Sequence, residues 1–364
     1  MIRDRASPDL PPPKEIAPGP WTWARANLFP TFGASVATLA CAALLLLILP
    51  PLLRWAVFDA TWTGTTREAC GPGGACWPFV TARLNQFLYG FYPAAEQWRV
   101  NLALALLVIP VGLLATAPLP RKGLLSILLF LIYPPLCLWL LAGGWGLPIV
   151  ETRDWGGLML TSFMALFGGL IAFPLGVLLA LGRQSSLPIV RTISITFIEF
   201  WRGVPIITVI FLASQLLPLI LPNGVDVNKL VRALIGLALV VAAYMAEVVR
   251  GGLAALPKGQ YEAADALGLN YWQATRLIVL PQALRTSIPG LVNEFIALLK
   301  NTTLVLIVSL FDLLGIVQAA LADPKWVGLT HEGYLFAGLT FWIICFGLSR
   351  WSLNLENRLG LGKR

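Results

Sequence analysis

Long apolar runs dominate the chain, and short segments between them carry most of the prolines, glycines and charges. A helix needs roughly 20 apolar residues to cross a hydrocarbon layer about 30 Å thick. By that measure the pattern predicts about eight spans, at residues 34–57, 100–117, 123–143, 155–182, 192–221, 230–250, 286–310 and 334–355. Lipid offers the backbone no hydrogen-bonding partners, so each span should be helical. The predicted fold class is an all-α, polytopic membrane helical bundle.

The fifth run is too long for one straight span. Pro205 and Pro218 fall inside it, and a proline interrupts the hydrogen-bond ladder of a helix. We therefore expect a bent or broken helix there. Its first part, around "ITFIEFWRG", should lie near the inner membrane surface.

Composition agrees with a membrane protein, since 57% of the residues are hydrophobic and 12% are charged. No water-soluble domain could bury that much apolar surface in one core. The net charge of +8 could suit a nucleic-acid-binding protein, but the basic residues are spread over short loops. We therefore predict no nucleic-acid partner, and we expect the lipid bilayer to be the chain's surroundings.

The distribution of basic residues predicts the orientation. With the N-terminus inside, the inner segments 1–31, 118–122, 183–191, 251–285 and 356–364, together with Arg250 and Arg350, hold 16 Lys and Arg, and the outer segments hold 8. Because cytoplasmic loops carry the excess of basic residues, both termini are predicted to be cytoplasmic.

Two cysteines stand apart from the other three. Cys70 and Cys76 enclose "CGPGGAC" in a polar outer loop whose glycines and proline can bring the two thiols within reach. A disulfide is the preferred interpretation, and two unpaired thiols are the alternative. The single histidine, His331, leaves no residue cluster for a metal site, and none is predicted.

The chain changes character near residue 150. Residues 1–31 form a proline-rich tail ending in "WTWARANLF", a candidate interfacial helix. Residues 32–150 contain three spans with scarcely a charge and an outer loop at 58–98. Residues 151–364 contain five spans that carry charged side chains, so function is expected there.

The longest inner loop, residues 251–285, contains "GQYEAADALGLNYWQATRLIVLPQALR". "YEAADALGL" favours a short helix that a glycine then stops. Such a short helix is not stable alone in water, so we expect it to dock in a groove of another protein. A solvated connector is the alternative.

This loop resembles a known motif. The pattern EAA-x3-G-x9-I-x-LP of ABC importer permeases is matched by Glu262, Ala263, Ala264, Gly268, Ile278, Leu280 and Pro281. The resemblance covers roughly residues 155–358, including "EFWRGVP" and "LLKNTTL". It is strongest to the polar amino acid subfamily, and the N-terminal extension is similar to the longer permease of general L-amino acid systems.

The resemblance implies a permease subunit with a five-helix core of type I, not an enzyme, in a bacterial inner membrane. It implies no cofactor in this chain, with ATP and Mg bound by a partner ATPase. The implied partners are a second permease subunit in a heterodimer, two ATPase subunits, a periplasmic amino acid-binding protein and an amino acid substrate. In such proteins the motif couples to the ATPase, with Gly268 allowing a turn and Pro281 starting the seventh span.

Charged and polar groups inside spans are candidates for a substrate pathway, because each needs a partner or a wet cavity. Glu294 and Asn301 share one helix face, whereas Lys300 falls on another. Glu294, Lys300, Asn301, Thr302 and Thr303 are predicted to form either a substrate pathway or a network that locks the bundle.

Two further pairs have i to i+3 spacing, Glu199 with Arg202 and Glu247 with Arg250. They are predicted to form ion pairs that hold a gate or anchor the coupling loop. Two other functions stay open at this point. One is a secondary transporter driven by an ion gradient, and the other is a structural subunit that only supports a partner permease.

Overall fold

The structure is a computed structural model that describes residues 19–117, 120–220, 222 and 227–360. These residues form helices and turns, with isolated β-bridges and no β-strand. The chain divides into two compact units. One comprises Met1–Trp62 and Glu68–Cys76, and the other comprises Thr63–Arg67 and Trp77–Arg364.

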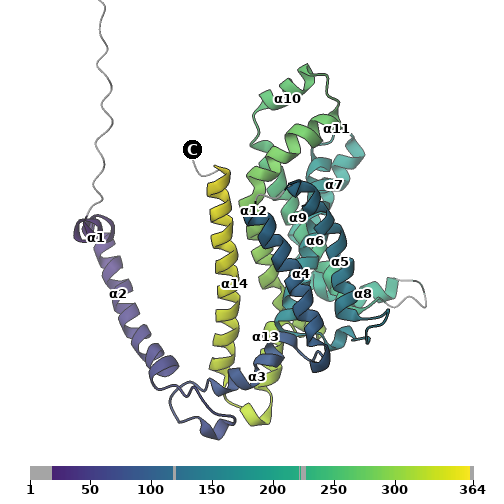
Figure 1. Cartoon of the computed structure of the whole chain (residues 1–364). Coiled ribbons are helices and arrows are strands. Elements are labelled where there is room, and N and C mark those ends of the chain that lie inside the picture. The colour runs from purple at the N-terminus through teal and green to yellow at the C-terminus, as the bar shows by residue number, and fades with distance from the viewer. Residues whose placement is uncertain (1–18, 118–119, 221, 223–226, 361–364) are drawn as a thin grey trace, which may run out of the picture. The chain divides into compact units, whose positions relative to one another are not determined.

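The first unit contains α1 (Pro20–Leu28), α2 (Phe32–Leu53) and a π-helical turn (Arg54–Phe58), drawn in purple in Figure 1. Helix α1 confirms the short helix predicted at "WTWARANLF", whereas residues 1–18 of the predicted tail lie outside the described residues. Cys70 and Cys76 form a disulfide with their Cα atoms 5.5 Å apart, as the loop sequence predicts.

The second unit holds the remaining helices (Figure 1). They are α3 (Pro78–Tyr89), α4 (Gln97–Thr116), α5 (Lys122–Ala142), α6 (Gly157–Arg183), α7 (Pro188–Gly203), α8 (Ile206–Ile220), α9 (Lys229–Ala254), α10 (Lys258–Ala266), α11 (Tyr271–Ala274), α12 (Leu280–Asn301), α13 (Leu313–Leu321) and α14 (Thr330–Leu359). A π-helical turn occupies Thr275–Val279, and short 3₁₀ turns occupy Ala94–Glu96, Thr152–Asp154, Thr302–Val308 and Pro324–Trp326. A further 3₁₀ turn, Arg67–Ala69, includes residues of both units.

Eight membrane spans are present if the bent helix pair α7–α8 counts as one, which agrees with the sequence prediction. The described residues contain seven other helical segments long and apolar enough to cross a membrane. Helices α7 and α8 meet at an angle of 104°. Val204, between them, has the extended conformation that a following proline requires, so Pro205 causes the break, whereas Pro218 lies inside α8 without ending it.

The seventh span begins earlier than predicted. The helical segment runs from Tyr271 to Val308, whereas the sequence prediction starts it at residue 286. Asn270 and Gln273 form a capping box that starts α11, and the π-helical turn Thr275–Val279 joins α11 to α12 without a break. Pro281 does lie in the first turn of α12, as predicted, but that turn continues an existing helix.

Helix α9 lies at the centre of the second unit and packs against α6, α7, α8 and α12. Glycines allow the close contacts. A Cβ atom on Gly176 of α6 would lie 3.0 Å from the carbonyl oxygen of Ala242 on α9. One on Gly252 of α9 would lie 2.5 Å from the carbonyl oxygen of Ala283 on α12. These helices are therefore held at distances that larger residues would not permit.

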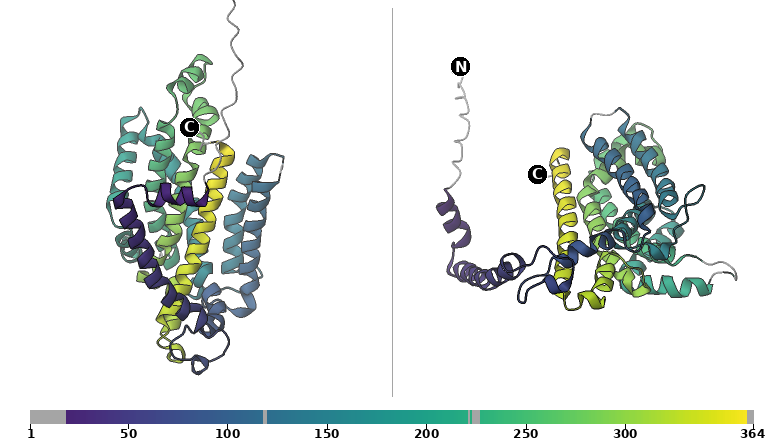
Figure 2. Two further views of the ribbon diagram at one scale, coloured as in Figure 1. Left: turned by 90° about the vertical axis from the view of Figure 1, so that its left-hand side faces the viewer. Right: turned by 60° about the horizontal axis from the view of Figure 1, so that its bottom comes forward.

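Helices α4 and α5 pack side by side in both figures and share the buried core of α6 (Figures 1 and 2). Arg99 of α4 is fully buried, pairs with Glu96 at 2.8 Å and donates to the carbonyl oxygen of Pro148 at 3.0 Å. The predicted division of the chain near residue 150 stays a prediction. One compact unit contains helices from both sides of that position.

Asp312 connects the end of the seventh span to α6. Its carboxylate accepts a hydrogen bond from the backbone N–H of Gly315 at 2.9 Å and so caps α13. The next residue, Leu313, donates its N–H to the hydroxyl of Thr161 on α6 at 3.0 Å. The Asp312 side chain is fully buried by these contacts.

Candidate functional site

A polar cavity of about 510 Å³ opens between the α7–α8 bend, α9 and α12. Its charged and polar lining residues are Arg202 at the end of α7, Tyr244 of α9, and Glu294 and Asn301 of α12. The remaining lining is mostly apolar, including Val240, Val241 and Leu298. The α7–α8 bend positions Arg202 here, because it turns the end of α7 toward α9.

The two charged side chains of this cavity do not form a direct ion pair with each other among the residues described. The Arg202 guanidinium lies over the Tyr244 ring, 5.7 Å from the ring centroid. The cavity therefore presents a cation, a carboxylate and the Asn301 amide to whatever enters it.

The predicted pathway residues do not all meet here. Glu294 and Asn301 line the cavity together, as their seven-residue spacing predicts. Lys300 is exposed and is not among the lining residues. The hydroxyls of Thr302 and Thr303 donate to the carbonyl oxygens of Leu299 and Lys300, each at 2.8 Å, and neither residue lines the cavity. Arg202, predicted as half of an ion pair, takes part in the cavity in place of Lys300.

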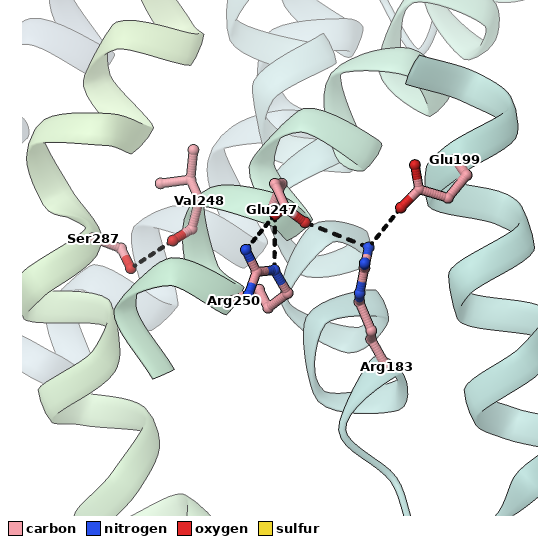
Figure 3. A network of polar contacts seen from close by, with 6 residues as sticks. All are labelled: Arg183, Glu199, Glu247, Val248, Arg250 and Ser287. Carbon is pink, nitrogen blue, oxygen red and sulfur yellow. Dashed lines mark hydrogen bonds and ion pairs between the residues drawn. The ribbon is translucent and has the colours of Figure 1, made fainter. Parts of the chain in front are cut away.

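A second polar cluster joins the ends of α6, α7 and α9 (Figure 3). Glu247 of α9 accepts from the Arg250 Nε atom at 2.8 Å, which confirms the predicted pair. Glu199 of α7 does not pair with Arg202, and the prediction was wrong in that respect. It binds Arg183 of α6 at 3.0 Å, and the same guanidinium lies 3.5 Å from Glu247. Arg183 therefore ties three helices together.

Helix α10 and the short α11 extend beyond the other helices at one end of the second unit (Figures 1 and 2). Helix α10 ends as the sequence predicts. Gly268 has φ +69°. Its N–H donates to the carbonyl oxygen of Asp265 at 2.9 Å, and the N–H of Leu269 donates to the carbonyl oxygen of Ala264 at 3.1 Å. These two bonds form a Schellman motif, which favours glycine at this position.

Only one side of α10 is covered within the chain. Ala264 is fully buried, and Gln282 of α12 donates a hydrogen bond to Gln260 at 2.9 Å. Glu262, Ala263 and Leu267 are exposed. In the second half of the motif, Ile278 and Leu280 are half-buried and Pro281 is exposed. The helix thus presents a free face, as a docking element would.

Comparison with known proteins addresses the family. Residues 172–361 match the family profile described as "Binding-protein-dependent transport system inner membrane component". The chain is also 51% identical over 347 residues to the inner membrane amino-acid ABC transporter permease protein YhdY of Escherichia coli strain K12, covering 94% of this chain and 93% of that protein. This chain belongs to that permease family.

Two further relatives agree with the assignment. The glutamate/glutamine/aspartate/asparagine transport system permease protein BztC of Rhodobacter capsulatus is 39% identical over 406 residues, covering 93% of each chain. Among solved structures, the "Crystal structure of an amino acid ABC transporter with histidines" matches with a TM-score of 0.50 and 26% identity, covering 56% of this permease and 92% of that chain.

The matched region contains the residues of both polar clusters and the α10 segment. The cavity of Arg202 and Glu294 places charged side chains between membrane-spanning helices, where each needs a partner or a wet space. Sequence reasoning missed Arg183 because its two carboxylate partners lie 16 and 64 residues away.

Proposed function

We propose that this permease is the translocation subunit of an ATP-driven importer for polar or general L-amino acids. The observation that carries the proposal is the cavity that presents Arg202, Glu294 and Asn301 together. An amino acid has a carboxylate that needs a cation and an ammonium group that needs an anion. The names of YhdY and BztC, both amino acid permeases, support the same substrate class.

In this proposal Arg202 binds the substrate carboxylate, Glu294 binds the ammonium group, and Asn301 bonds to either end. Charged hydrogen bonds in a cavity with apolar walls are stronger than in water, which would hold a zwitterion briefly on its route. Lys300, Thr302 and Thr303 stay predicted members of the pathway without a place in this cavity. The cluster of Arg183, Glu199, Glu247 and Arg250 would form a gate at the inner end.

The family and the exposed face of α10 support a proposed set of partners. ATP and Mg would bind to a separate ATPase present in two copies, with no cofactor in the permease itself. Exposed Glu262 and Ala263 would contact that ATPase, and Gln260 would pass the movement to α12 through Gln282. A second permease subunit and a periplasmic amino acid-binding protein would complete the importer. Both termini would then be cytoplasmic in a bacterial inner membrane.

Uptake of labelled amino acids into vesicles containing the purified complex tests this assignment. Arg202→Met and Glu294→Gln should each raise the substrate concentration needed for half-maximal uptake by about tenfold or more, since a hydrogen bond to a charged group contributes about 1.5–3 kcal/mol. Lys300→Met is the comparison variant: Lys300 lies on α12 beside Asn301 but outside the cavity lining, so its effect on uptake should be smaller than that of either cavity variant.

Three results would contradict the proposal. Unchanged uptake and specificity in both cavity variants would indicate a structural subunit that only supports its partner. Uptake that survives loss of ATP hydrolysis but stops when the ion gradient is removed would indicate a secondary transporter. A larger effect from Lys300→Met than from either cavity variant would move the pathway to the other face of α12.

A further inference from the structure

A second cavity, of about 310 Å³, lies between the end of α3 and helices α4, α5 and α6. Its lining is mostly hydrocarbon, from residues that include Leu104, Leu107, Leu141, Met159, Phe163 and Phe167, and it includes no charged side chain. It shares no lining residue with the polar cavity of Arg202. The second cavity is therefore separate from the proposed substrate route, and what it binds is argued independently of the transport function.

Two polar side chains, Tyr89 and Asn101, lie at one end of this apolar cavity, and a third, Ser162, lies about midway along it. The Tyr89 hydroxyl, in the last residue of α3, donates to the Asn101 side chain near the start of α4 at 2.8 Å. Ser162 lies five residues after the first residue of α6, about 8 Å along the helix. Its side chain is exposed and makes no hydrogen bond to another described residue. Deeper in the cavity, the Tyr133 hydroxyl is already bonded to the carbonyl oxygen of Ala103 at 3.2 Å.

The cavity is long and open rather than sealed. Along α6 its lining extends from Leu158 to Phe167, a rise of about 14 Å, which is close to half of a hydrocarbon core about 30 Å thick. Leu104 on the α4 side is 54% exposed, so the space communicates with the surroundings of the spans. About 8 Å of this length lies beyond Ser162, so the cavity has room for the part of an acyl chain nearest its ester group, and the opening lets the rest of the chain continue into the surrounding bilayer.

Two other occupants fit this cavity poorly. An amino acid would bury both of its charges against hydrocarbon with no ionic partner, which is strongly unfavourable. One turn of a partner subunit's helix, about 10 Å wide and about 5.4 Å long, occupies roughly 420 Å³, which exceeds the cavity volume of about 310 Å³. A flexible hydrocarbon chain with a polar group at one end matches both the apolar depth and the polar end.

We propose that this cavity holds one acyl chain of a membrane phospholipid. The chain lies along α6 between α4 and α5, its ester group accepts a hydrogen bond from Ser162, and its headgroup lies beside Tyr89 and Asn101. The lipid thereby fills the space between the α4–α5 pair and α6.

A phospholipid with a photoreactive group in its acyl chain tests the proposal. The full chain, in the complex in which it is purified, is placed in vesicles with a small fraction of this lipid and irradiated, and labelled peptides are mapped. Labelling should be saturable and should concentrate on cavity residues of α4, α5 and α6. Ser162→Trp should reduce it by about tenfold, because the indole occupies the space of several methylene groups.

Matched variants keep the result interpretable. Leu104→Trp also fills the cavity from an exposed position and replaces Ser162→Trp if that variant is not recovered folded. Leu102→Trp is the control, since Leu102 is exposed on α4 and does not line the cavity, so labelling should stay as in the unmodified chain. Non-saturable labelling, equal labelling of all variants, or cross-linking of cavity residues to a partner polypeptide would each overturn the proposal.

Discussion

Replacing Gly268 by alanine should loosen the end of α10 without introducing a clash. Gly268 has φ +69°, and a Cβ atom placed on it would have no neighbour within 4 Å. The cost is therefore the strain of a left-handed conformation for an L-residue, about 1–2 kcal/mol. In a local opening equilibrium this corresponds to a factor of about 5–30.

Hydrogen–deuterium exchange of the intact complex measures this effect. Amides near the C-terminal end of α10, including those of the two Schellman hydrogen bonds, should exchange about 5–30 times faster in Gly268→Ala than in the unmodified chain. If α10 couples to an ATPase as proposed, the amount of substrate transported per ATP hydrolysed should also decrease, because a looser helix transmits movement less efficiently.

Gly259→Ala is the matched control. Gly259 lies in the first turn of the same helix, its φ is not positive, and a Cβ atom there would also have no neighbour within 4 Å. The same chemical change should therefore stabilise α10, by up to about 1 kcal/mol, and slow exchange. Equal exchange in both variants, or faster exchange in Gly259→Ala, would refute the argument that backbone conformation at Gly268 determines where α10 ends.

Three further changes test packing and charge. Gly252→Ala should reduce the free energy of unfolding by about 1–3 kcal/mol and so lower the thermal unfolding midpoint of the complex, because its Cβ would lie 2.5 Å from a backbone oxygen of α12. Gly251→Ala, with open space around it, should not lower the midpoint. Equal midpoints for the two variants would contradict the packing argument. Arg183→Met should lower the free energy of unfolding by about 1 kcal/mol or less, because the ion pair of Arg183 with Glu199 is partly exposed. A double-mutant cycle with Glu199→Gln that gives a much larger coupling energy would contradict this expectation. Burial raises the pKa of the Asp312 carboxyl from 3.8 to about 6. Between these two pH values the folded chain therefore binds more protons than the unfolded chain does. The free energy of unfolding should fall by roughly 3 kcal/mol as the pH rises from about 4 to about 6. Asp312→Asn should retain the cap of α13 and lose this pH dependence in thermal unfolding, and an unchanged slope would contradict it.

The spans were predictable because hydropathy and proline act locally. The break at Pro205 follows from the geometry of one dipeptide, and it occurs where the sequence predicts it. The start of the seventh span was less predictable. Its first residues are polar enough to read as a loop, yet the capping box of Asn270 and Gln273 starts a helix there, 15 residues before the predicted start.

The candidate site shows where local pattern stops being sufficient. Glu294 and Asn301 could be placed on one face from their spacing along a single helix. The membership of Arg202 in the same cavity depends on the bend between α7 and α8 and on how α7 packs against α9. Glu199 and Arg202 have the spacing of an ion pair along one helix. In the structure, however, Glu199 pairs with Arg183 on α6.

The sequence alone determined which segments cross the membrane, where the fifth span bends, where α10 ends and which motif it carries, because each depends on residues within a few helical turns. Only the tertiary structure decided which charges share a cavity, which carboxylates Arg183 bridges and where apolar space is left between α4, α5 and α6. Those outcomes depend on the packing of helices distant in sequence. Helical periodicity specifies the face on which a side chain lies, but not which helix that face meets.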